Sequence, residues 1–391
     1  MPTDSLDNRA PTANPSGTAA GWIRVWDLPT RAFHWLLVFC LTITFKTGFF
    51  GPASALDWHV WAGYAIGALV VWRLIWGLFG SEYSRLDRLF GALANLREHA
   101  EGLLGSRPKH YAGHNPLGSL MILGLLGVLI AITGTGFVVL GGVDKQGVLA
   151  SSTPYAVGHL AKGVHQLLAY LLVAMIIGHV GGVIAESVLL RLPLIRGMIT
   201  GWLPAGGEGE VARPRSARLA VALGCAAFAM FAVYDIVASL IVLPALGLPG
   251  PITNAGYLKE CGACHWAVHP SLLPRTSWER MMGSLTSHFG ENADLDAKTT
   301  AEIAAFLSAN AAETADTQAA NRFRAVDAAY PLRITATGFW VQKHREIAEA
   351  VFKSTAVGGR MNCPACHRDA KSGRFNVQAI DVPATTLEPK P

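Results

Sequence analysis

The sequence predicts an all-α protein in which a transmembrane helical bundle is followed by a small helical domain. Mean hydropathy over the 391 residues is +0.34 and only 15% of the residues are charged, which is too apolar for an ordinary soluble protein. The long uncharged runs end near residue 243, and the composition from Asn254 onward is that of a soluble domain. We therefore expect two structural parts that meet near residues 244–256.

Five apolar stretches are long enough, or nearly so, to cross about 30 Å of hydrocarbon as helices. They cover roughly residues 33–49, 58–79, 117–140, 159–186 and 217–243. The first stretch is short, and its Lys46 lies near one end, where a lysine can extend to the interface. Residues 1–21 are polar and rich in Pro, Ala, Thr and Asn, so we expect a disordered cytoplasmic tail.

Basic residues alternate between the connections of this bundle. The 50–57 and 141–158 connections carry Lys145 as their single base, whereas two other connections are strongly basic. The positive-inside rule then places the N-terminus in the cytoplasm and the C-terminal domain in the periplasm of a bacterial inner membrane. This distribution also explains the net charge of +5 without nucleic-acid binding. The bases are Arg85, Arg88, Arg97, Arg107 and Lys109 in the 80–116 connection, and Arg191, Arg196, Arg213, Arg215 and Arg218 in the 187–218 connection.

Two Cys-x-x-Cys-His strings lie in the soluble part. In such a string two thiols bond the porphyrin of a c-type haem and the histidine binds its iron. A single string is also compatible with a zinc half-site or a redox dithiol, but two strings that both end in His favour covalent haem. The remaining cysteines, Cys40 and Cys225, lie alone in apolar runs. The strings are Cys261-Gly-Ala-Cys264-His265 and Cys363-Pro-Ala-Cys366-His367.

Each c-type iron needs a second axial ligand if it only carries electrons. The candidates are His269, His288 and His344. His269 follows His265 by four residues on the same helical face, so it cannot reach the opposite side of that haem, and we expect it at the surface. It could still be a ligand of the other haem. His288 and His344 each share a helical face with apolar residues. Met281, Met282 and Met361 are rival ligands that we expect in the core.

Four histidines in the membrane part form a second pattern. His165 and His179 are fourteen residues apart, which on a helix is about 21 Å of rise and within about 40° of one face. Depth then pairs His34 with His179 near the inner surface and His59 with His165 near the outer surface, as two imidazoles for each of two stacked haems. The alternative is that His34 and His59 belong to the interfacial aromatic belt.

Other polar residues of the membrane part have less specific interpretations. Arg73 could pair with a haem propionate or extend to the interface, and the sequence does not separate these. We expect His159 to be interfacial, and the histidines of the inner connection to be solvated. Those histidines are His99, His110 and His114.

The strings "RVWDLPTRAFHW" and "WHVWAGYAIGALVVWRLIWGLFG", followed by His165 and His179, resemble the bacterial two-haem cytochrome b561 family. This family includes the b-type subunit of nickel-iron hydrogenases, and the resemblance covers about residues 22–200. It implies that His34, His59, His165 and His179 are the four haem ligands. The fifth helix would then tether the next domain without binding haem.

The region 256–382 resembles the bacterial dihaem cytochrome c family. The resemblance rests on "CGACHWAVHPSLLPRTSWERMMGSLTSHFGENADLD", on "QKHREI" and on the second Cys-x-x-Cys-His string. Both haems of that family have two histidine ligands, which implies His288 and His344 as the distal ones. Which of them serves which haem is not readable from sequence, and His269 stands where the family usually has an aromatic residue.

Together these features predict a 22–200 cytochrome b domain, a 201–243 segment with a cytoplasmic loop and the fifth helix, a 244–256 linker and a 257–391 dihaem domain. Two non-covalent b haems and two covalent c haems would carry electrons from the quinol pool to a periplasmic haem protein. Two alternatives are quinone reduction by a periplasmic donor and a gas-binding haem sensor. Whether the chain is an enzyme, such as a quinol:cytochrome oxidoreductase, stays open.

Overall fold

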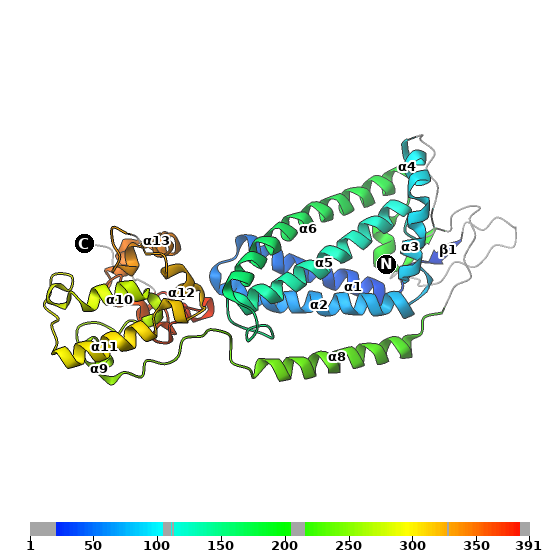
Figure 1. The fold of residues 1–391 in the computed structure, drawn as a ribbon. Helices are drawn as coiled ribbons and strands as arrows, with labels where there is room; N and C mark the ends of the chain where they lie inside the picture. Colours follow the sequence, from blue (N-terminus) through cyan, green and yellow to red (C-terminus); the bar gives the residue numbers. More distant parts are fainter. Residues whose placement is uncertain (1–20, 105–110, 112, 205–215, 327, 384–391) are drawn as a thin grey trace, which may run out of the picture. The chain divides into compact units, whose positions relative to one another are not determined.

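The computed structural model describes residues 21–104, 111, 113–204, 216–326 and 328–383. It is mainly helical, and five helices are long and apolar enough to cross a membrane (Figure 1). All five predicted spans are therefore confirmed as helices. The predicted tail, except for Gly21, and the basic residues Arg107, Lys109, Arg213 and Arg215 lie outside the described residues. The spans are α1 with its continuation (Leu28–Phe50), α2 (Leu56–Phe79), α5 (Pro116–Gly142), α6 (Tyr155–Leu189) and α8 (Leu219–Ile241).

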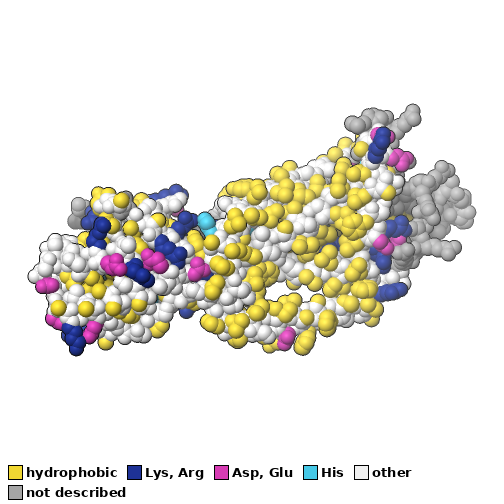
Figure 2. Space-filling view, in the orientation of Figure 1, with side chains coloured by type: hydrophobic (Ala, Val, Ile, Leu, Met, Phe, Trp, Pro, Cys, Tyr) yellow, Lys and Arg dark blue, Asp and Glu magenta, His cyan; other side chains and the backbone are white. Residues whose placement is uncertain are grey.

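The outward faces of these helices are apolar, as a bilayer requires (Figure 2). Phe39 is 63% exposed, Leu167 68% and Ile177 68%. Exposed apolar surface on this scale is unusual for a soluble protein and marks a surface that something apolar covers. The described helices therefore belong to a multi-pass membrane protein.

The first span is longer than predicted. It begins at Leu28, because the carboxylate of Asp27 accepts a hydrogen bond from the Thr30 amide at 2.9 Å and so caps the helix. Pro29 is tolerated in this first turn, where its missing amide hydrogen would have no partner. A π-helical turn, Lys46–Phe50, continues α1 at its other end, so the span covers 23 residues.

A small two-stranded sheet departs from the all-helical prediction. Strands β1 (Trp22–Arg24) and β2 (Trp202–Pro204) pair antiparallel, with Ile23 opposite Leu203. Gly201 makes the turn before β2 with a φ of +90°, and its carbonyl accepts hydrogen bonds from the two residues that follow β1. The sheet thus joins the segment before α1 to the segment after α6. The membrane part also contains three short helices, α3 (Leu86–Ala92), α4 (Leu96–Leu104) and α7 (Leu194–Thr200).

The C-terminal part is a set of short helices around a common apolar core. Polar caps start several of them: Asn254, Asp296, Thr317 and Thr337 each accept a hydrogen bond from an amide of the first turn. The core holds the side chains of Leu272, Leu273, Trp278, Ile303 and Leu307, among others. The helices are α9 (Ala255–Glu260), α10 (Arg275–Met282), α11 (Ala297–Ala309), α12 (Gln318–Phe323), α13 (Gly338–His344) and α14 (Glu349–Phe352).

The chain divides into two compact units that do not follow the domain limits expected from sequence. One unit holds Tyr64–Ile132, Leu168–Ala232 and the chain up to Thr42. The other holds Ile43–Gly63, Thr133–Leu167 and Val233–Pro391, so it combines one end of α2, α5 and α6 with the C-terminal part. The domain limits at 200, 243 and 256 stay predictions.

Within this second unit a buried ion pair joins the α5–α6 connection to the C-terminal part. Lys145 is 8% exposed and has a φ of +55°, and its Nζ donates to Oδ2 of Asp316 at 2.7 Å. The same nitrogen donates to the carbonyl of Thr153 at 3.1 Å. Asp316 also accepts from the Tyr155 amide at 2.7 Å and from Nδ2 of Asn321 at 3.1 Å. The carboxylate therefore bridges two chain segments.

The 244–256 segment is fixed at the same place. The amide of Asp316 donates to the carbonyl of Gly247 at 2.7 Å, and the Leu246 amide donates to the carbonyl of Ala150 at 2.8 Å. Gly247 has a φ of +67°, and a Cβ there would lie 2.3 Å from the Cβ of Asp316. The linker is thus hydrogen-bonded to both segments that the Lys145–Asp316 pair connects.

We predict that Asp316→Asn weakens this junction more than Lys145→Met does. The first change leaves a buried ammonium without its counter-ion, which typically costs about 3–5 kcal/mol. The second removes that ammonium, and the Asp316 carboxylate keeps the donors from Tyr155 and Asn321. Hydrogen exchange at the Leu246 and Asp316 amides measures the weakening, and it should be faster in Asp316→Asn than in wild type. The control is Asp294→Asn, at an exposed position. Equal exchange in Asp316→Asn and wild type would contradict the role given to the pair.

The pH dependence of the junction follows from Asp316. Burial acts to raise the pKa of Asp316, but hydrogen bonds from Lys145, Tyr155 and Asn321 outweigh it, so the net pKa lies below the ordinary 3.8. A carboxyl whose pKa is lower in the folded state stabilises that state above its unfolded pKa and loses the effect as the pH falls through the folded pKa. Exchange at the Leu246 amide, corrected for intrinsic rates, should therefore show no loss of protection from neutral pH down to about pH 4.

Candidate functional site

His59 and His165 face each other in the second unit. Their ring centroids are 6.2 Å apart, with an angle of 68° between the planes. Nδ1 of His59 lies 3.2 Å from the Thr44 carbonyl and 3.2 Å from Oγ1 of Thr47, and Nδ1 of His165 lies 3.1 Å from Oγ1 of Thr135. A Nδ1–H that donates to the Thr44 carbonyl leaves the lone pair of Nε2 for a metal.

Glycines make room for both imidazoles. A Cβ on Gly48, in the π-helical turn, would lie 3.1 Å from Cε1 of His59. A Cβ on Gly136, in α5, would lie 3.4 Å from Cε1 of His165. The first distance is tighter than ordinary contact, so a larger residue at Gly48 would displace the His59 ring.

His34 and His179 meet in the first unit. They lie close enough for their charges to interact, and Nδ1 of His34 is buried without a hydrogen-bond partner among the described residues. Helix α6 thus supplies one ligand candidate to each unit, His165 to the second and His179 to the first.

Arg73 is buried near Asp27 and His114, which lie just before α1 and α5. It is 4% exposed, and its Nη1 has no hydrogen-bond partner in the described part of the chain. The nearby Asp27 carboxylate already accepts hydrogen bonds from Nε1 of Trp76 at 2.9 Å and from the Ser81 hydroxyl at 2.5 Å. A buried guanidinium with a free nitrogen is suited to an anionic group such as a haem propionate.

Two histidines of the 80–116 connection, His99 and His114, are not solvated, contrary to expectation. His99 is 6% exposed and contacts Tyr111, and His114 packs against Trp26 with ring centroids 4.5 Å apart. Burial, with a smaller effect from Arg73 and then His179, lowers the pKa of His114 to about 3. His110 lies outside the described residues.

In the C-terminal part each Cys-x-x-Cys-His histidine faces one distal candidate. His265 and His288 have ring centroids 6.2 Å apart and nearly parallel planes, at 21°. His344 and His367 have ring centroids 6.1 Å apart, with an angle of 70° between the planes. The geometry thus brings His288 to His265 and His344 to His367.

These spacings fit a metal between two imidazoles. A metal–nitrogen bond of about 2.0–2.1 Å on each side places the ring centroids about 6 Å apart. The three measured distances are 6.1–6.2 Å. In the protein, the described His, Cys, Asp and Glu residues form no group of three or more that could hold a bare metal ion. Pairs of this kind suit a cofactor that brings its own four equatorial ligands.

The protonation of the C-terminal histidines also suits iron binding, which requires neutral imidazole. Burial lowers the pKa of His288, His344 and His367, and a neighbouring positive charge adds to this in each case. Nδ1 of His265 lies 2.7 Å from the Trp266 carbonyl, and Nδ1 of His344 lies 2.8 Å from the Trp340 carbonyl. Each of these two rings can therefore offer its Nε2 to iron.

The four motif cysteines form no disulfide bonds in the structure. Cys261 follows α9, and Cys363 begins a short 3-10 turn. Burial raises the pKa of Cys363 to about 11 and also raises the pKa of Cys261. The two strings are connected, because Nε1 of Trp266 donates to the carbonyl of Met361 at 2.6 Å.

His269 is a buried structural residue, so the surface position expected for it is wrong. It is 2% exposed, and its Nδ1 accepts from the Ser271 amide at 3.2 Å. Its Nε2 lies 2.9 Å from the Gly250 carbonyl. Both nitrogens are engaged, so neither is free for iron. The core positions expected for Met281 and Met282 are confirmed, but Met361 is 40% exposed.

Two phenylalanines that sequence reasoning missed contact one ligand candidate each. The ring of Phe289 lies 5.0 Å from His288, and the ring of Phe375 lies 5.0 Å from His367. Both have left-handed backbones, with φ of +51° and +56°, which bulky residues rarely adopt. Phe289 and Gly290 form a hairpin turn that Asn-Gly would fit better. The sequence signal was an aromatic residue where a turn residue belongs.

The His344–His367 region is bonded to the segments that carry His59 and His165. Nε2 of Gln378 donates to Asp57 at 3.3 Å, two residues before His59. The Gln378 segment is itself bridged to His367, which pairs with Ile380. Arg322 adds contacts to Tyr155 at 3.1 Å and to the exposed His159 at 3.2 Å.

Comparisons with known proteins identify both parts. Residues 25–201 match the model of the prokaryotic cytochrome b561 family, and residues 257–375 match that of dihaem cytochrome c. The probable Ni/Fe-hydrogenase 1 B-type cytochrome subunit of Escherichia coli K12 is 25% identical over 211 residues, 46% of this chain and 89% of that protein. The corresponding probable subunit of Cupriavidus necator is 25% identical over 222 residues, 48% of this chain and 89% of that protein.

Two solved structures resemble the C-terminal part. The diheme cytochrome c from Rhodobacter sphaeroides is 36% identical over 32% of this chain and 98% of that chain, with a TM-score of 0.28. That from Shewanella baltica is 33% identical over 34% of this chain and 94% of that chain, with a TM-score of 0.27. The two family matches indicate a bacterial membrane electron-transfer protein, with residues 25–201 similar to the prokaryotic cytochrome b561 family and residues 257–375 similar to the dihaem cytochrome c family.

Proposed function

We propose that this protein carries electrons from membrane quinol through two b haems and two c haems to a soluble haem protein in the periplasm. The observation that carries the proposal is the set of histidine pairs at 6.1–6.2 Å, each with the spacing of two imidazoles on one iron. Haem iron supplies one-electron chemistry at such sites, and two imidazoles keep it low-spin and closed to other ligands.

Each residue has a stated role in this proposal. Arg73 binds a propionate of the inner b haem, which gives its free buried nitrogen a partner. The thiols of Cys261 and Cys264 attach one c haem, and those of Cys363 and Cys366 attach the other. The axial pairs are His34 with His179, His59 with His165, His265 with His288, and His344 with His367.

The order of the c haems follows from the contacts of the C-terminal part. Gln378 connects the neighbourhood of the His344–His367 pair to the segment of His59. Cys363 and Cys366 would therefore hold the c haem that is nearer to the outer b haem. Cys261 and Cys264 would hold the second c haem, which would supply the electron to the soluble partner.

The orientation in the proposal rests on the loop charges. The basic 80–116 and 187–218 connections face the cytoplasm, so the N-terminus is inside and the c haems are in the periplasm. Quinol is then oxidised in the membrane part. The five spans and the family match support a multi-pass bacterial membrane protein in general.

The opposite direction is the second candidate. The curated relatives of the membrane part carry the name of hydrogenase b-type subunits, which favours electron entry from a periplasmic donor and quinone reduction. A gas sensor is disfavoured, because two histidines for each c haem leave no open position on the iron.

The histidine assignment predicts haem loss one site at a time. His165→Leu and His179→Leu should each reduce the b haem content from two to one per chain, since each removes one axial ligand of a non-covalent haem. The c haem content should stay at two. Pyridine haemochrome spectra of the purified protein count both kinds.

His159→Gln is the matched control, because His159 is on the same helix and bonds Arg322. It should retain both b haems. Full b haem content in either leucine variant would refute the proposed ligands.

The proposed order predicts an asymmetry between two cysteine variants. Without the haem on Cys363 and Cys366 (both changed to Ala), quinol should still reduce the b haems, but the remaining c haem should stay oxidised on the time scale of the wild-type reaction. Without the haem on Cys261 and Cys264, the remaining c haem should still be reduced. Stopped-flow absorbance after mixing with a quinol separates the two cases.

The b haem content of both variants, measured beforehand, shows whether the membrane part is intact. The reverse asymmetry would overturn the order, and b haems that stay oxidised in wild type would overturn quinol oxidation.

Phe289→Asn should lower the midpoint potential of one c haem and leave the fold intact. Asn-Gly fits the left-handed turn at residues 289–290 better than Phe-Gly, so the domain should unfold at the same temperature or higher. A polar side chain beside His288 favours the charged ferric state, so one c haem should show a lower midpoint potential. Phe375→Asn should lower the potential of the other c haem. Potentials unchanged in both variants would contradict the proposed contact.

A further inference from the structure

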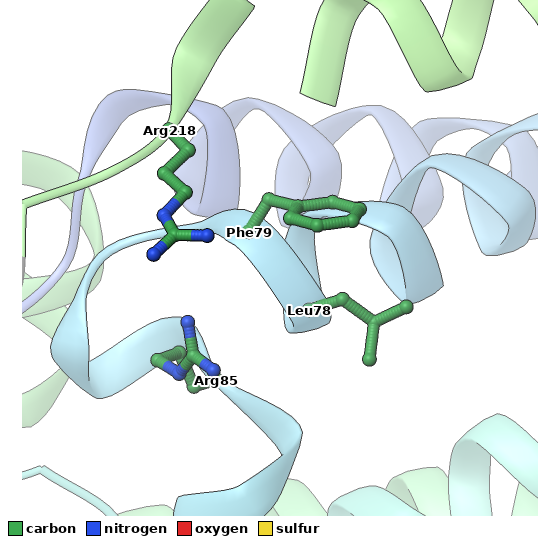
Figure 3. A pocket seen from close by; sticks show the side chains of 4 residues that line it. All are labelled: Leu78, Phe79, Arg85 and Arg218. Atoms are coloured by element: carbon green, nitrogen blue, oxygen red, sulfur yellow. The ribbon is translucent and has the colours of Figure 1, made fainter. Parts of the chain in front are cut away.

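A pocket of about 450 Å³ lies where α2 ends and the chain enters α8 (Figure 3). Leu78 and Phe79 form its apolar part, and the side chains of Arg85 and Arg218 point toward one another across it. All four residues belong to the first compact unit, outside the proposed haem sites. Two guanidinium groups and an apolar wall thus share one space.

The pocket is held in place by the backbone. The amide of Arg218 donates to the carbonyl of Phe79, the last residue of α2, at 2.8 Å. On the other side, α2 packs closely against the start of α3: a Cβ on Gly77 would lie 2.5 Å from Cγ of Leu86. The three segments that line the pocket are therefore joined at this end of α2.

The pocket has an excess of positive charge. Nε of Arg85 lies 3.3 Å from both carboxylate oxygens of Asp87, which is 52% exposed. Among the residues that the structure describes, no ion pair is recorded for the side chain of Arg218, and none for the Nη atoms of Arg85. Two like charges that face each other repel, so an anion placed between them would be stabilised by both.

The position of the pocket identifies the chemistry of this anion. Phe79 ends one candidate membrane span and Leu219 begins another, so the arginines are at the level where a bilayer changes from hydrocarbon to headgroups. Leu78 is 55% exposed, and Leu219 and Leu223 of α8 are each 52% exposed. An apolar surface therefore runs from the arginines along both spans.

We propose that Arg85 and Arg218 bind the phosphate of an anionic glycerophospholipid whose acyl chains lie against Leu78 and the start of α8. Paired guanidinium groups match phosphate oxygens, and basic pockets between membrane helices are typical sites for acidic lipid headgroups. A free phosphate would use the two arginines but not the apolar surface beside them. The lipid uses both.

Native mass spectrometry of the detergent-purified full chain tests the proposal. Wild type should retain added phosphatidylglycerol in preference to phosphatidylcholine. Each of Arg85→Gln and Arg218→Gln should weaken phosphatidylglycerol binding about fivefold, and the double variant about 30-fold, from roughly 1 kcal/mol for each basic residue near a membrane surface. Haem content, measured on the same samples, shows that the variants are folded.

Arg97→Gln is the control, because Arg97 lies in the same basic connection, is 92% exposed and pairs with Glu101. It should leave phosphatidylglycerol binding at the wild-type level. A double variant that binds phosphatidylglycerol as wild type does would overturn the site, as would equal affinity of wild type for the two lipids. Inorganic phosphate is the second probe: displacement of the lipid by millimolar phosphate would show an ordinary anion site and would also overturn the proposal.

Discussion

The spacing of facing imidazoles is the constraint on which the rest of this protein depends. Three pairs have ring centroids 6.1–6.2 Å apart, and only the His59–His165 pair joins segments far apart in the sequence. To keep that spacing, one nitrogen of a ring is bonded to the protein, as His344 is to the Trp340 carbonyl. Glycines such as Gly48 stand where a side chain would collide with a ring.

Patterns that repeat along a single element were predictable from sequence. The five spans follow from apolar runs, and the approach of His59 to His165 was expected from depth alone. The haem assignment itself stays a prediction. The Cys-x-x-Cys-His strings led to the dihaem cytochrome c family, and the family model matches that region.

Features set by contacts between distant segments were not predictable. The start of α1 depends on the carboxylate of Asp27, whose other partners, Trp76 and Ser81, lie about fifty residues away. The β1–β2 sheet pairs three residues with three others across most of the membrane part, which is too short a signal to detect. His269 had a plausible surface position until the Gly250 carbonyl was seen beside its Nε2. In each case the partner, and not the residue itself, decided the outcome.

The Lys145–Asp316 pair has a consequence for the proposed electron transfer between the two parts of the chain. Because the carboxylate bridges the α5–α6 connection and the C-terminal part, and Gly247 is bonded to the same residue, the soluble part has no free tether on which to diffuse. In the proposed electron path, transfer between the membrane and C-terminal parts would then be a unimolecular event at a fixed separation, insensitive to solvent viscosity and to protein concentration. Only the encounter with the proposed external protein would be limited by diffusion.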